Sequence, residues 1–575
     1  MKRTIYTLIR KFYSGLKEIP SVIWFVLFSG LVLRIFGIWH VEQNDEFNEV
    51  FEAIKVASGK LNIYRWNKKG FIYILAGEYG IYFIISWLLG IYSSIADFAH
   101  KIVRDMTPLF IIGRTTSAVF GTVIIFFTYK IGEQFKKNTG LISAIFLTPV
   151  TVHVVHSHLV LVDITMTLSL VIALWFITRF YVDPKLSNYF GAGFFTGYAI
   201  IAKIPAVFLI LPFITAHFFV WYNSNEHFKR LFINNKLFLY ISGGFSGSIV
   251  CNPALLIALP NFIHYLLHIF GAHQGQEDQI PLQINGFWFY FNSMVMNAGP
   301  FVVILSIIGS LKSIFKFQQK ELILASFIIP FFVFMSLSKW YVLDRYLIPI
   351  YPFLSILAAS ITVDFYNKIN YRIIKNYYFQ TLIILIIIAI PLFFSIKFNV
   401  SLIEKNTRYW AKDWIEKNIP ANSKILIDAG RTINTYSPPL AQNEANLLAM
   451  IEKIKNTPDG ETFDDSKIVD SESSVYFELL LKTLPDITYD LTTTERGFKV
   501  ADLDYYINNG YQYVITSSNS TWRFELPEWK NEFPKSSAFY ERVKTDCSLI
   551  KSFEPSTYRM GPIINIYSIK ENLTN

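Results

Sequence analysis

The sequence predicts an α-helical, polytopic membrane protein with about 11 to 13 transmembrane helices and a C-terminal soluble α/β domain. The 575 residues are 52% hydrophobic and only 17% charged, and the mean hydropathy is +0.35. This composition is too apolar for a soluble protein of this length. Many stretches also reach the roughly 20 apolar residues that one helix needs to cross a bilayer. From residue 399 onward the sequence turns acidic and loses these stretches.

The positive-inside rule orients the predicted helices, because basic loops stay in the cytoplasm. The predicted spans are residues 21–39, 108–131, 139–155, 159–182, 188–202, 204–222, 237–259, 287–311, 320–338, 343–364 and 377–397. This arrangement places every basic loop inside, namely those with Lys136/Lys137, Arg179/Lys185, Lys229/Arg230/Lys236, Lys312/Lys316/Lys320 and Lys368/Arg372/Lys375. We therefore expect a multi-pass protein of the plasma (inner) membrane with a cytoplasmic N-terminus and an uncleaved first helix.

One further apolar stretch, 81–98, would reverse this pattern if it crossed the bilayer. We interpret it as a membrane-dipping helix within a long first outer loop, 40–107. A second large outer loop, 260–286, contains no Lys or Arg. The chain then divides into a transmembrane domain, 1–398, and an extracytoplasmic α/β domain, 399–575.

The outer domain is of a size that supports one core. Extended apolar runs are predicted at 424–427, 511–516 and 563–569, an amphipathic helix at 409–418, and an irregular insertion at 458–474. Cys251 and Cys547 are too far apart in this topology to form a disulfide, and no thiol chemistry is expected. The basic excess lies beside the membrane spans, where it serves topology and lipid headgroups, so no nucleic-acid partner is indicated.

Charged residues inside the spans are costly and are therefore candidates for function. Five of them fall in the outer third of the membrane: Arg34, Arg114, Asp163, Lys203 and Arg345. A secondary transporter would hold its polar site near the midplane, between repeated halves. An enzyme that acts on a lipid headgroup at the outer leaflet would produce the pattern observed.

Asp45 and Glu46 begin the first outer loop and are candidate catalytic carboxylates. A hydroxyl nucleophile must lose its proton as it attacks, so adjacent carboxylates suit a general base or a metal site. Acidic residues at a helix N-terminus, capped by Asn44, would give the same pattern for structural reasons.

Two other groups have both a functional and a structural interpretation. His264 and His268 share a helix face and could bind a divalent metal, or could simply solvate the outer loop. Lys203 and Arg345 could neutralise a lipid phosphate, or could extend toward headgroups as Lys and Arg commonly do. His156 and His158 suit hydrogen bonds at the interface better than metal ligation. The sequence establishes no cofactor, and a divalent metal ion is the one candidate.

In order along 25–430, the sequence resembles the C-type (GT-C) glycosyltransferases, in particular protein O-mannosyltransferases and lipid A aminoarabinose transferases. The residues that carry the resemblance are Arg34, Asp45-Glu46, Arg114, Pro149, His153, His156-Ser157-His158, Asp163, Gly193, Gly197, Lys203, Gly271, His273, Gly275, Gly299-Pro300, Arg345-Tyr346, Pro349 and Trp414-Ile415. One motif departs from the family: Glu78-Tyr79-Gly80-Ile81 replaces the usual Pro-Pro-Leu type.

The resemblance implies a polyprenyl- or dolichyl-phosphate-linked sugar as donor and an inverting transfer outside the cytoplasm. It implies that Asp45 acts at the acceptor or at a metal, with Glu46 beside it, and that Asp163 is the second acidic position. Lys203 and Arg345 match positions suited to the donor phosphate, and we group Arg114 and His273 with them. The acceptor would be a lipid, a protein or a glycan. Membrane lipids are the other expected partners.

Three alternatives remain at this point. An oligosaccharyltransferase or polymerase would use a diphosphate-linked glycan and a divalent metal. A non-enzymatic lipid or solute transporter would move its ligand without covalent change. A sensor or assembly scaffold would tolerate loss of Asp45, Lys203 or Arg345.

Overall fold

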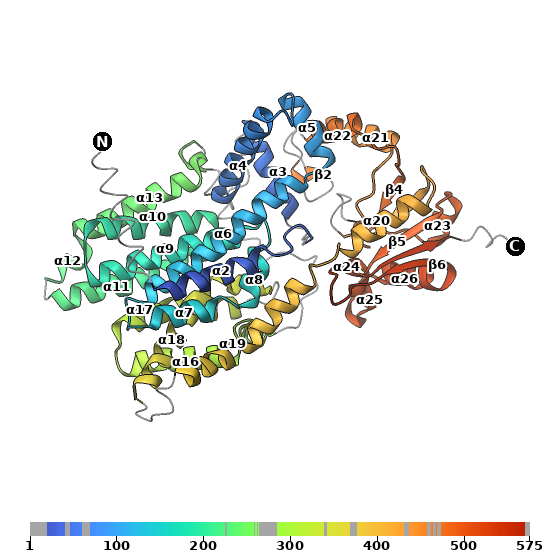
Figure 1. Ribbon diagram of the computed structural model, residues 1–575. Coiled ribbons are helices and arrows are strands. Elements are labelled where there is room, and N and C mark those ends of the chain that lie inside the picture. Colours follow the sequence, from blue (N-terminus) through green and yellow to red (C-terminus); the bar gives the residue numbers. More distant parts are fainter. Residues whose placement is uncertain are drawn as a thin grey trace. The chain divides into compact units, whose positions relative to one another are not determined.

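The computed structural model divides the chain into two compact units (Figure 1). It describes residues 20–40, 46–59, 69–224, 227–257, 259–260, 263, 285–337, 342–368, 377–429, 436–456, 462–463, 467–468 and 473–569. The first unit is helical and comprises Met1–Ile38, Glu49–Ala76 and Gly113–Asn399. The second contains the sheet and comprises Trp39–Asn48, Gly77–Ile112 and Val400–Asn575. Parts of the first outer loop thus group with the C-terminal region rather than with the membrane helices.

Every predicted span coincides with a helix or with a consecutive pair of helices. These are α2 (Ser21–Ile35), α6 (Thr107–Gly132), α7 (Thr139–Leu147), α8 (Thr151–Ser157), α9 (Val162–Val182), α10 (Leu186–Ala202), η1 (Ile204–Leu209), α11 (Ile210–Ser224), α13 (Asn235–Cys251), α15 (Gly286–Ala298), α16 (Pro300–Phe315), α17 (Gln319–Ser336), η3 (Asp344–Ile350), α18 (Tyr351–Lys368) and α19 (Tyr377–Val400). Among the described residues, 7 helices are long and apolar enough to cross a membrane, or up to 9 if each bent pair is one span. The expected multi-pass helical architecture is confirmed.

Two spans that we predicted as continuous helices are bent. The pair α7 and α8 turns by 67°, and the pair α15 and α16 by 115°. Pro149 causes the first bend, since proline lacks an N–H and restricts the residue before it. Gly299 causes the second with φ 85°, a left-handed conformation open to glycine, and Pro300 then starts α16 at its first position. The single helix predicted for 287–311 is therefore wrong.

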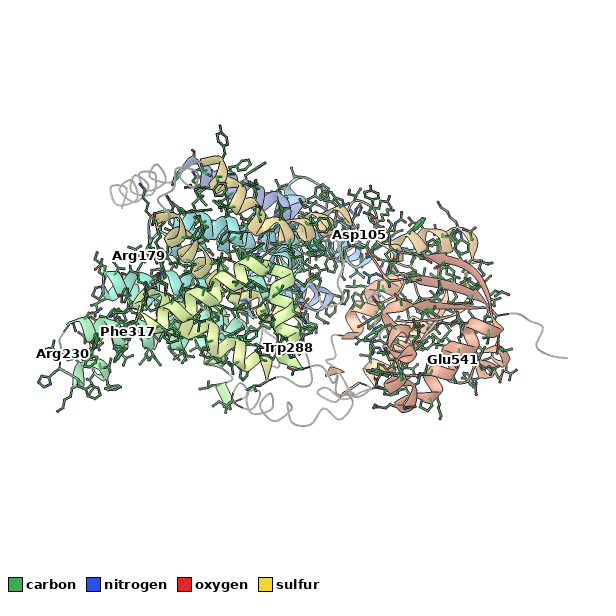
Figure 2. All side chains as sticks on the ribbon, turned by 90° about the horizontal axis from the view of Figure 1, so that it is seen from below. Asp105, Arg179, Arg230, Trp288, Phe317 and Glu541 are labelled. Carbon is green, nitrogen blue, oxygen red and sulfur yellow. The ribbon has the colours of Figure 1, made fainter. Side chains whose placement is uncertain are left out.

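Hydrogen bonds join the predicted inner loops to one another at one end of the helical unit, which we call the basic end. The Gln319 Oε1 accepts from the Tyr181 hydroxyl and from Asn223 Nδ2, each at 2.9 Å. Lys136 Nζ lies 2.8 Å from Asp364 Oδ1, and Lys312 contacts the other oxygen of that carboxylate. Figure 2 shows Arg179, Arg230 and Phe317 at this end, with Trp288 at the other end of the helices. These predicted inner loops therefore lie at the same end of the helical unit.

The opposite end of the helical unit contains the intramembrane charges. α9 runs from Asp163 to its last turn at Arg179, and sixteen residues of helix measure about 24 Å. α10 begins beside the Lys185 loop and ends at Lys203, while α18 carries Asp364 near its basic end and follows η3, which contains Arg345. Asp163, Lys203 and Arg345 therefore share the end remote from the basic loops.

The segment between α2 and α6 corrects one boundary of the prediction. The stretch 81–98 is not one helix: α4 (Lys69–Leu88) begins earlier, Gly90 turns the chain at φ 72°, and α5 (Ile95–Arg104) follows. α4 is long enough to span a membrane. However, α3 (Glu46–Ala57) and α5 are too short for the return crossing. Arg114 Nη1 also donates to the Ile38 carbonyl at 2.8 Å, so the segment leaves and rejoins the helices at the same end.

Helices α10 and α13 pack with their backbones in contact. A Cβ on Gly197 would overlap the Gly244 carbonyl oxygen, and one on Gly193 would overlap the Tyr240 carbonyl oxygen. From α13, a Cβ on Gly243 or Gly247 would likewise meet carbonyl oxygens of α10. Small residues at a spacing of four create this approach, which is the common way for helices to associate in lipid.

The C-terminal region is built on a five-stranded sheet of order β4-β1-β5-β7-β6. Strands β1 (Lys424–Ile427), β4 (Asp490–Thr493) and β5 (Tyr513–Ser517) are parallel to one another. Strand β7 (Ile564–Ser568) is antiparallel to both of its neighbours, β5 and β6 (Ser548–Phe553). Three predicted runs correspond to β1, β5 and β7, and the predicted helix corresponds to α20 (Thr407–Asn418). The sequence analysis missed β4 and β6. Within the predicted insertion the described residues form a short hairpin, β2 (Thr462–Phe463) and β3 (Lys467–Ile468).

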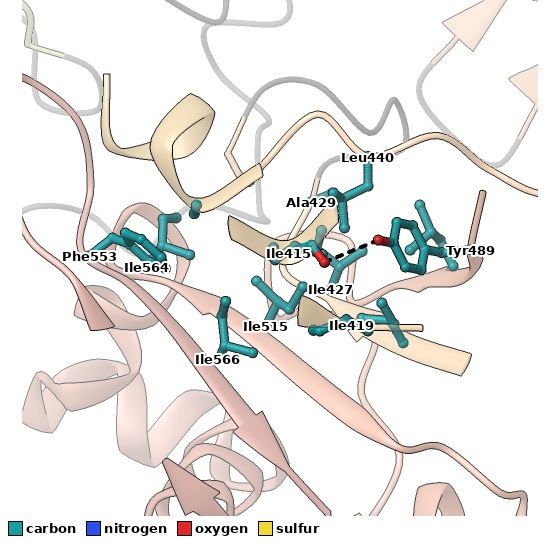
Figure 3. Close-up of a cluster of buried hydrophobic side chains, with 13 residues drawn as sticks. Ile415, Ile419, Ile427, Ala429, Leu440, Tyr489, Ile515, Phe553, Ile564 and Ile566 are labelled. Atoms are coloured by element: carbon teal, nitrogen blue, oxygen red, sulfur yellow. Dashed lines mark hydrogen bonds between the residues drawn. The ribbon is translucent and has the colours of Figure 1, made fainter. Parts of the chain in front are cut away.

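Helices cover both faces of this sheet, because successive side chains of a strand point in opposite directions. Ile425 and Ile427 pack under α20, in the cluster of Figure 3 where the Tyr489 hydroxyl donates to the Ile415 carbonyl. Leu426 points to the other face, toward α23 (Leu503–Asn508) and α26 (Pro534–Asp546). The remaining helices of this region are α21 (Glu444–Lys455), α22 (Ser473–Lys482), α24 (Ser518–Thr521), η4 (Trp522–Glu525) and α25 (Pro527–Glu532).

Asp428 is a buried carboxylate directly after β1, only 1% exposed. Its Oδ1 accepts from the Tyr540 hydroxyl at 2.6 Å and from Thr494 Oγ1 at 2.7 Å, and its Oδ2 accepts from the Ser517 N–H at 3.1 Å. Burial raises the pKa of Asp428 to about 6, although these three donors oppose the rise.

Replacing Gly197 by Ala should lower the stability of the helical unit. The added methyl group meets a backbone carbonyl that cannot move aside, and such overpacking costs about 1–3 kcal/mol. Thermal unfolding in detergent measures the effect. Gly80→Ala is the matched control, since Gly80 is also helical and has nothing within 4 Å of a new Cβ. Equal melting temperatures for the two variants would contradict the packing argument.

Asp428 should make the C-terminal region less stable above pH 6 than below pH 4. Its pKa rises from 3.8 to about 6 on folding, so the folded state binds the proton more tightly. The stabilisation is therefore complete below the unfolded pKa and is lost as the pH rises through 6, by up to about 3 kcal/mol. Asp428→Asn should remove this dependence, so its stability relative to the wild type improves between pH 4 and 7. Asp486→Asn, an exposed control, should show no such trend.

Candidate active site

The centre of the candidate site is an ion pair between Asp163 and Lys203. Lys203 Nζ lies 2.6 Å from Asp163 Oδ1, and the two side chains are 22% and 4% exposed. Asp163 occupies the first turn of α9, where the helix dipole favours a negative charge. A buried carboxylate needs a counter-charge, so the pair fixes the start of α9 against the end of α10.

The sequence places Lys203 at this position by ending α10 there. Pro205 cannot continue an α-helix, and Lys203 adopts an extended conformation at φ −159° as the C-cap of α10. The chain then continues as the 3₁₀ helix η1. The side chain at this break is directed to Asp163 rather than along the surface of α10.

Arg345 and Tyr346 bring η3 to the same place. The Lys203 ammonium lies 5.0 Å from the centre of the Tyr346 ring, and the Arg345 guanidinium lies 6.0 Å from it. Asp163 is within electrostatic reach of Lys203, His156 and Arg345. Residues from α8, α9, the α10–η1 break and η3 therefore converge, although nearly two hundred positions separate the first from the last.

Two arginines that the sequence singled out make structural hydrogen bonds. Arg34 is fully buried, donates to the carbonyls of Gly30 and Thr148 at 2.9 and 3.2 Å, and lies 2.9 Å from His153 Nδ1. The Thr148 carbonyl is exposed by the helix break at Pro149, so Arg34 compensates for that break. Arg114 is 5% exposed and bonds the Ile38 carbonyl, which holds the start of the first outer loop.

Most candidate residues of the two predicted outer loops lie outside the described part of the chain. Asp45, His264, His268 and His273 are not among the described residues. Glu46 is described: it is fully buried as the first residue of α3. No group of three or more His, Cys, Asp or Glu side chains suited to a metal occurs within the described ranges.

The sequence analysis gave too little weight to two residues. His156 is near enough to interact electrostatically with Asp163, whereas we expected only interface hydrogen bonds from it. Its neighbour His158 matches that expectation, with ring nitrogens 2.9 Å from the Val154 carbonyl and 3.0 Å from the Phe36 carbonyl. Tyr346 was noted only as part of a motif. Its position next to Arg345 in a turn could have indicated that its ring lies near the charged groups of the site.

This arrangement defines a class of protein: a multi-pass membrane protein with paired cations at one end of its helices. Residues 84–257 match the family described as dolichyl-phosphate-mannose-protein mannosyltransferase. The matched stretch includes Asp163 and Lys203. The resemblance to C-type glycosyltransferases that the sequence suggested is therefore confirmed.

Solved structures extend the likeness over nearly the whole chain. The apo oligosaccharyltransferase of Archaeoglobus fulgidus is 12% identical and covers 94% of this chain and 75% of its own, with a TM-score of 0.50. ArnT from Cupriavidus metallidurans in the apo state is 12% identical and covers 96% and 98%, with a TM-score of 0.45. No curated protein is significantly similar in sequence. The fold of this chain is therefore similar to that of the Archaeoglobus fulgidus oligosaccharyltransferase.

Proposed function

We propose that this protein transfers a sugar from a polyprenyl-phosphate donor to an acceptor outside the cytoplasm, with inversion at the anomeric carbon. The convergence of Asp163, Lys203 and Arg345 at the end remote from the basic loops supports this proposal. The proposal also includes a plasma-membrane location, with the N-terminus inside and 399–575 outside. The acceptor is a hydroxyl or amine on a lipid, a protein or a glycan.

The charge of the site fits such a donor. Lys203 and Arg345 bring two cations to the site, and a lipid-phosphate sugar is a phosphodiester with one negative charge. When the bond between the anomeric carbon and the phosphate oxygen breaks, the lipid phosphate leaves as a monoester with a second negative charge. Lys203 and Arg345 would stabilise that added charge in a site of low dielectric constant. Asp163 holds Lys203 in position for this role.

Asp45 completes the proposed reaction as the general base. It accepts the proton of the acceptor hydroxyl or amine while the acceptor atom attacks the anomeric carbon, and Glu46 lies beside it in the sequence. Proton transfer of this kind contributes roughly two to four decades in rate. The donor reaches the site by lateral diffusion in the membrane, so no nucleotide-binding fold is needed.

Asp45→Asn should abolish transfer, because the amide cannot accept the proton. Purified protein is incubated with a panel of polyprenyl-phosphate sugars, and donor consumption is followed by mass spectrometry. Asp105→Asn is the matched control, an exposed carboxylate of the same outer loop that should keep full activity. The Asp45→Asn variant should lose transfer activity while its melting temperature and its binding of the donor stay unchanged. Turnover like the wild type in Asp45→Asn would refute the base assignment.

A double variant separates a phosphate contact from a purely structural role of Lys203. Lys203→Gln alone should lower stability by about 3–5 kcal/mol, because it leaves the buried Asp163 carboxylate without its partner. Adding Asp163→Asn should restore most of the melting temperature while kcat/KM stays about 100-fold or more below that of the wild type. If the double variant regained full activity, Lys203 would serve only to neutralise Asp163.

A further inference from the structure

The carboxyl edge of the parallel strands in the C-terminal region is built like a ligand site. β1 lies between β4 and β5, so the chain leaves β1 in one direction for β4 and crosses to the other side for β5. Open α/β sheets bind ligands at such switch points, outside the carboxyl ends of the strands. Asp428, Thr494 and Ser517 stand at these ends and are joined by hydrogen bonds.

The turn after β4 presents an arginine at this edge. Three successive residues have left-handed backbone angles: Glu495 at φ 47°, Arg496 at 67° and Gly497 at 84°. For residues with a Cβ this conformation is costly and persists only where the surroundings enforce it. Here the Arg496 N–H donates to the Ala429 carbonyl at 2.9 Å, which holds the turn against the end of β1. The Arg496 guanidinium lies 4.7 Å from the centre of the Tyr436 ring.

A second arginine approaches from the segment after β5. The Arg523 guanidinium lies 5.2, 5.8 and 5.5 Å from the ring centres of Phe498, Trp522 and Trp529. Its Nε is inaccessible to solvent and has no hydrogen-bond partner among the described residues. Three aromatic rings thus fix the direction of a cationic group without neutralising it.

The two guanidinium groups are near enough for the charge of Arg496 to act on Arg523. Burial lowers the pKa of Arg523, and the charge of Arg496 lowers it further. In the described ranges, neither arginine forms an ion pair with Asp or Glu. Arg542 of the same region, in contrast, contacts Asp502, Asp504 and Asp546. Asp428 does not serve as the partner, because both its oxygens accept hydrogen bonds from Tyr540, Thr494 and Ser517.

We propose that Arg496, Arg523 and Tyr436 form a binding site for an anionic saccharide, whose phosphate or carboxylate lies between the two guanidinium groups. Such a group would remove the repulsion of the like charges and accept hydrogen bonds from both side chains. Trp522 and Phe498, which are 48% and 38% exposed, offer aromatic surface beside the charges for the apolar face of a sugar ring. The site does not depend on the proposed transfer reaction, since it lies wholly within the C-terminal region and is tested by binding.

Calorimetric titration of the full chain in nanodiscs tests this site with glucose 1-phosphate, glucuronate, inorganic phosphate and glucose. Glucose 1-phosphate and glucuronate should bind saturably, and glucose should not. Arg496→Gln and Arg523→Gln should each weaken binding about tenfold or more, since each removes charge-assisted hydrogen bonds. Lys551→Gln, which removes an exposed cation from β6, should bind as the wild type does.

Arg496→Gln decides the outcome, because its side chain is exposed and its loss leaves the aromatic cluster around Arg523 in place. Binding unchanged in Arg496→Gln, or no saturable binding of either anionic sugar to the wild type, would overturn the proposal. Equal affinity for inorganic phosphate and glucose 1-phosphate would overturn the saccharide assignment. Tighter binding of glucose 1-phosphate than of glucuronate, or the reverse, would identify the anionic group.

Discussion

The ion pair of Asp163 and Lys203 determines how the end of the helical unit remote from the basic loops is built. A carboxylate this deeply buried is tolerated only beside a cation, and the cation is available only because α10 ends at Lys203. The same ammonium group contacts the Tyr346 ring, so η3 is included in the arrangement. One electrostatic requirement thereby connects three helices whose sequences are far apart.

A second requirement, that carbonyl groups in hydrocarbon find donors, explains the neighbouring charges. The break at Pro149 leaves carbonyls of α7 without helical partners. Arg34 bonds to Thr148, and the Ser395 hydroxyl donates to the Pro149 carbonyl at 2.9 Å. An arginine that looks catalytic from its depth in the membrane is therefore explained by backbone hydrogen bonding. The predicted depth of the charged residues in the membrane located the candidate site. It did not separate residues with a structural role from residues close to the ion pair.

Much of the architecture could be predicted because it depends on local properties. Apolar length located the spans, and loop charge gave their alternation, since both act without reference to distant residues. The bend at Gly299 could not be seen in hydropathy, because both halves are apolar. Strand β6 was missed because its exposed residues Leu549, Ile550 and Lys551 do not alternate as a half-buried strand does. The proximity of His156 to Asp163 depends on how α8 and α9 fold together, which no local pattern encodes.

The second unit includes more of the chain than its C-terminal portion. Phe47 lies edge-on to Tyr476 with 6.4 Å between ring centres, and α5 packs against α22. The chain therefore crosses between the two units several times instead of passing through one linker. A cut at residue 399 would separate α22 from α5, which packs against it. The unit that contains the sheet is consequently not one contiguous segment, and a protein that began at residue 400 would lack part of that unit.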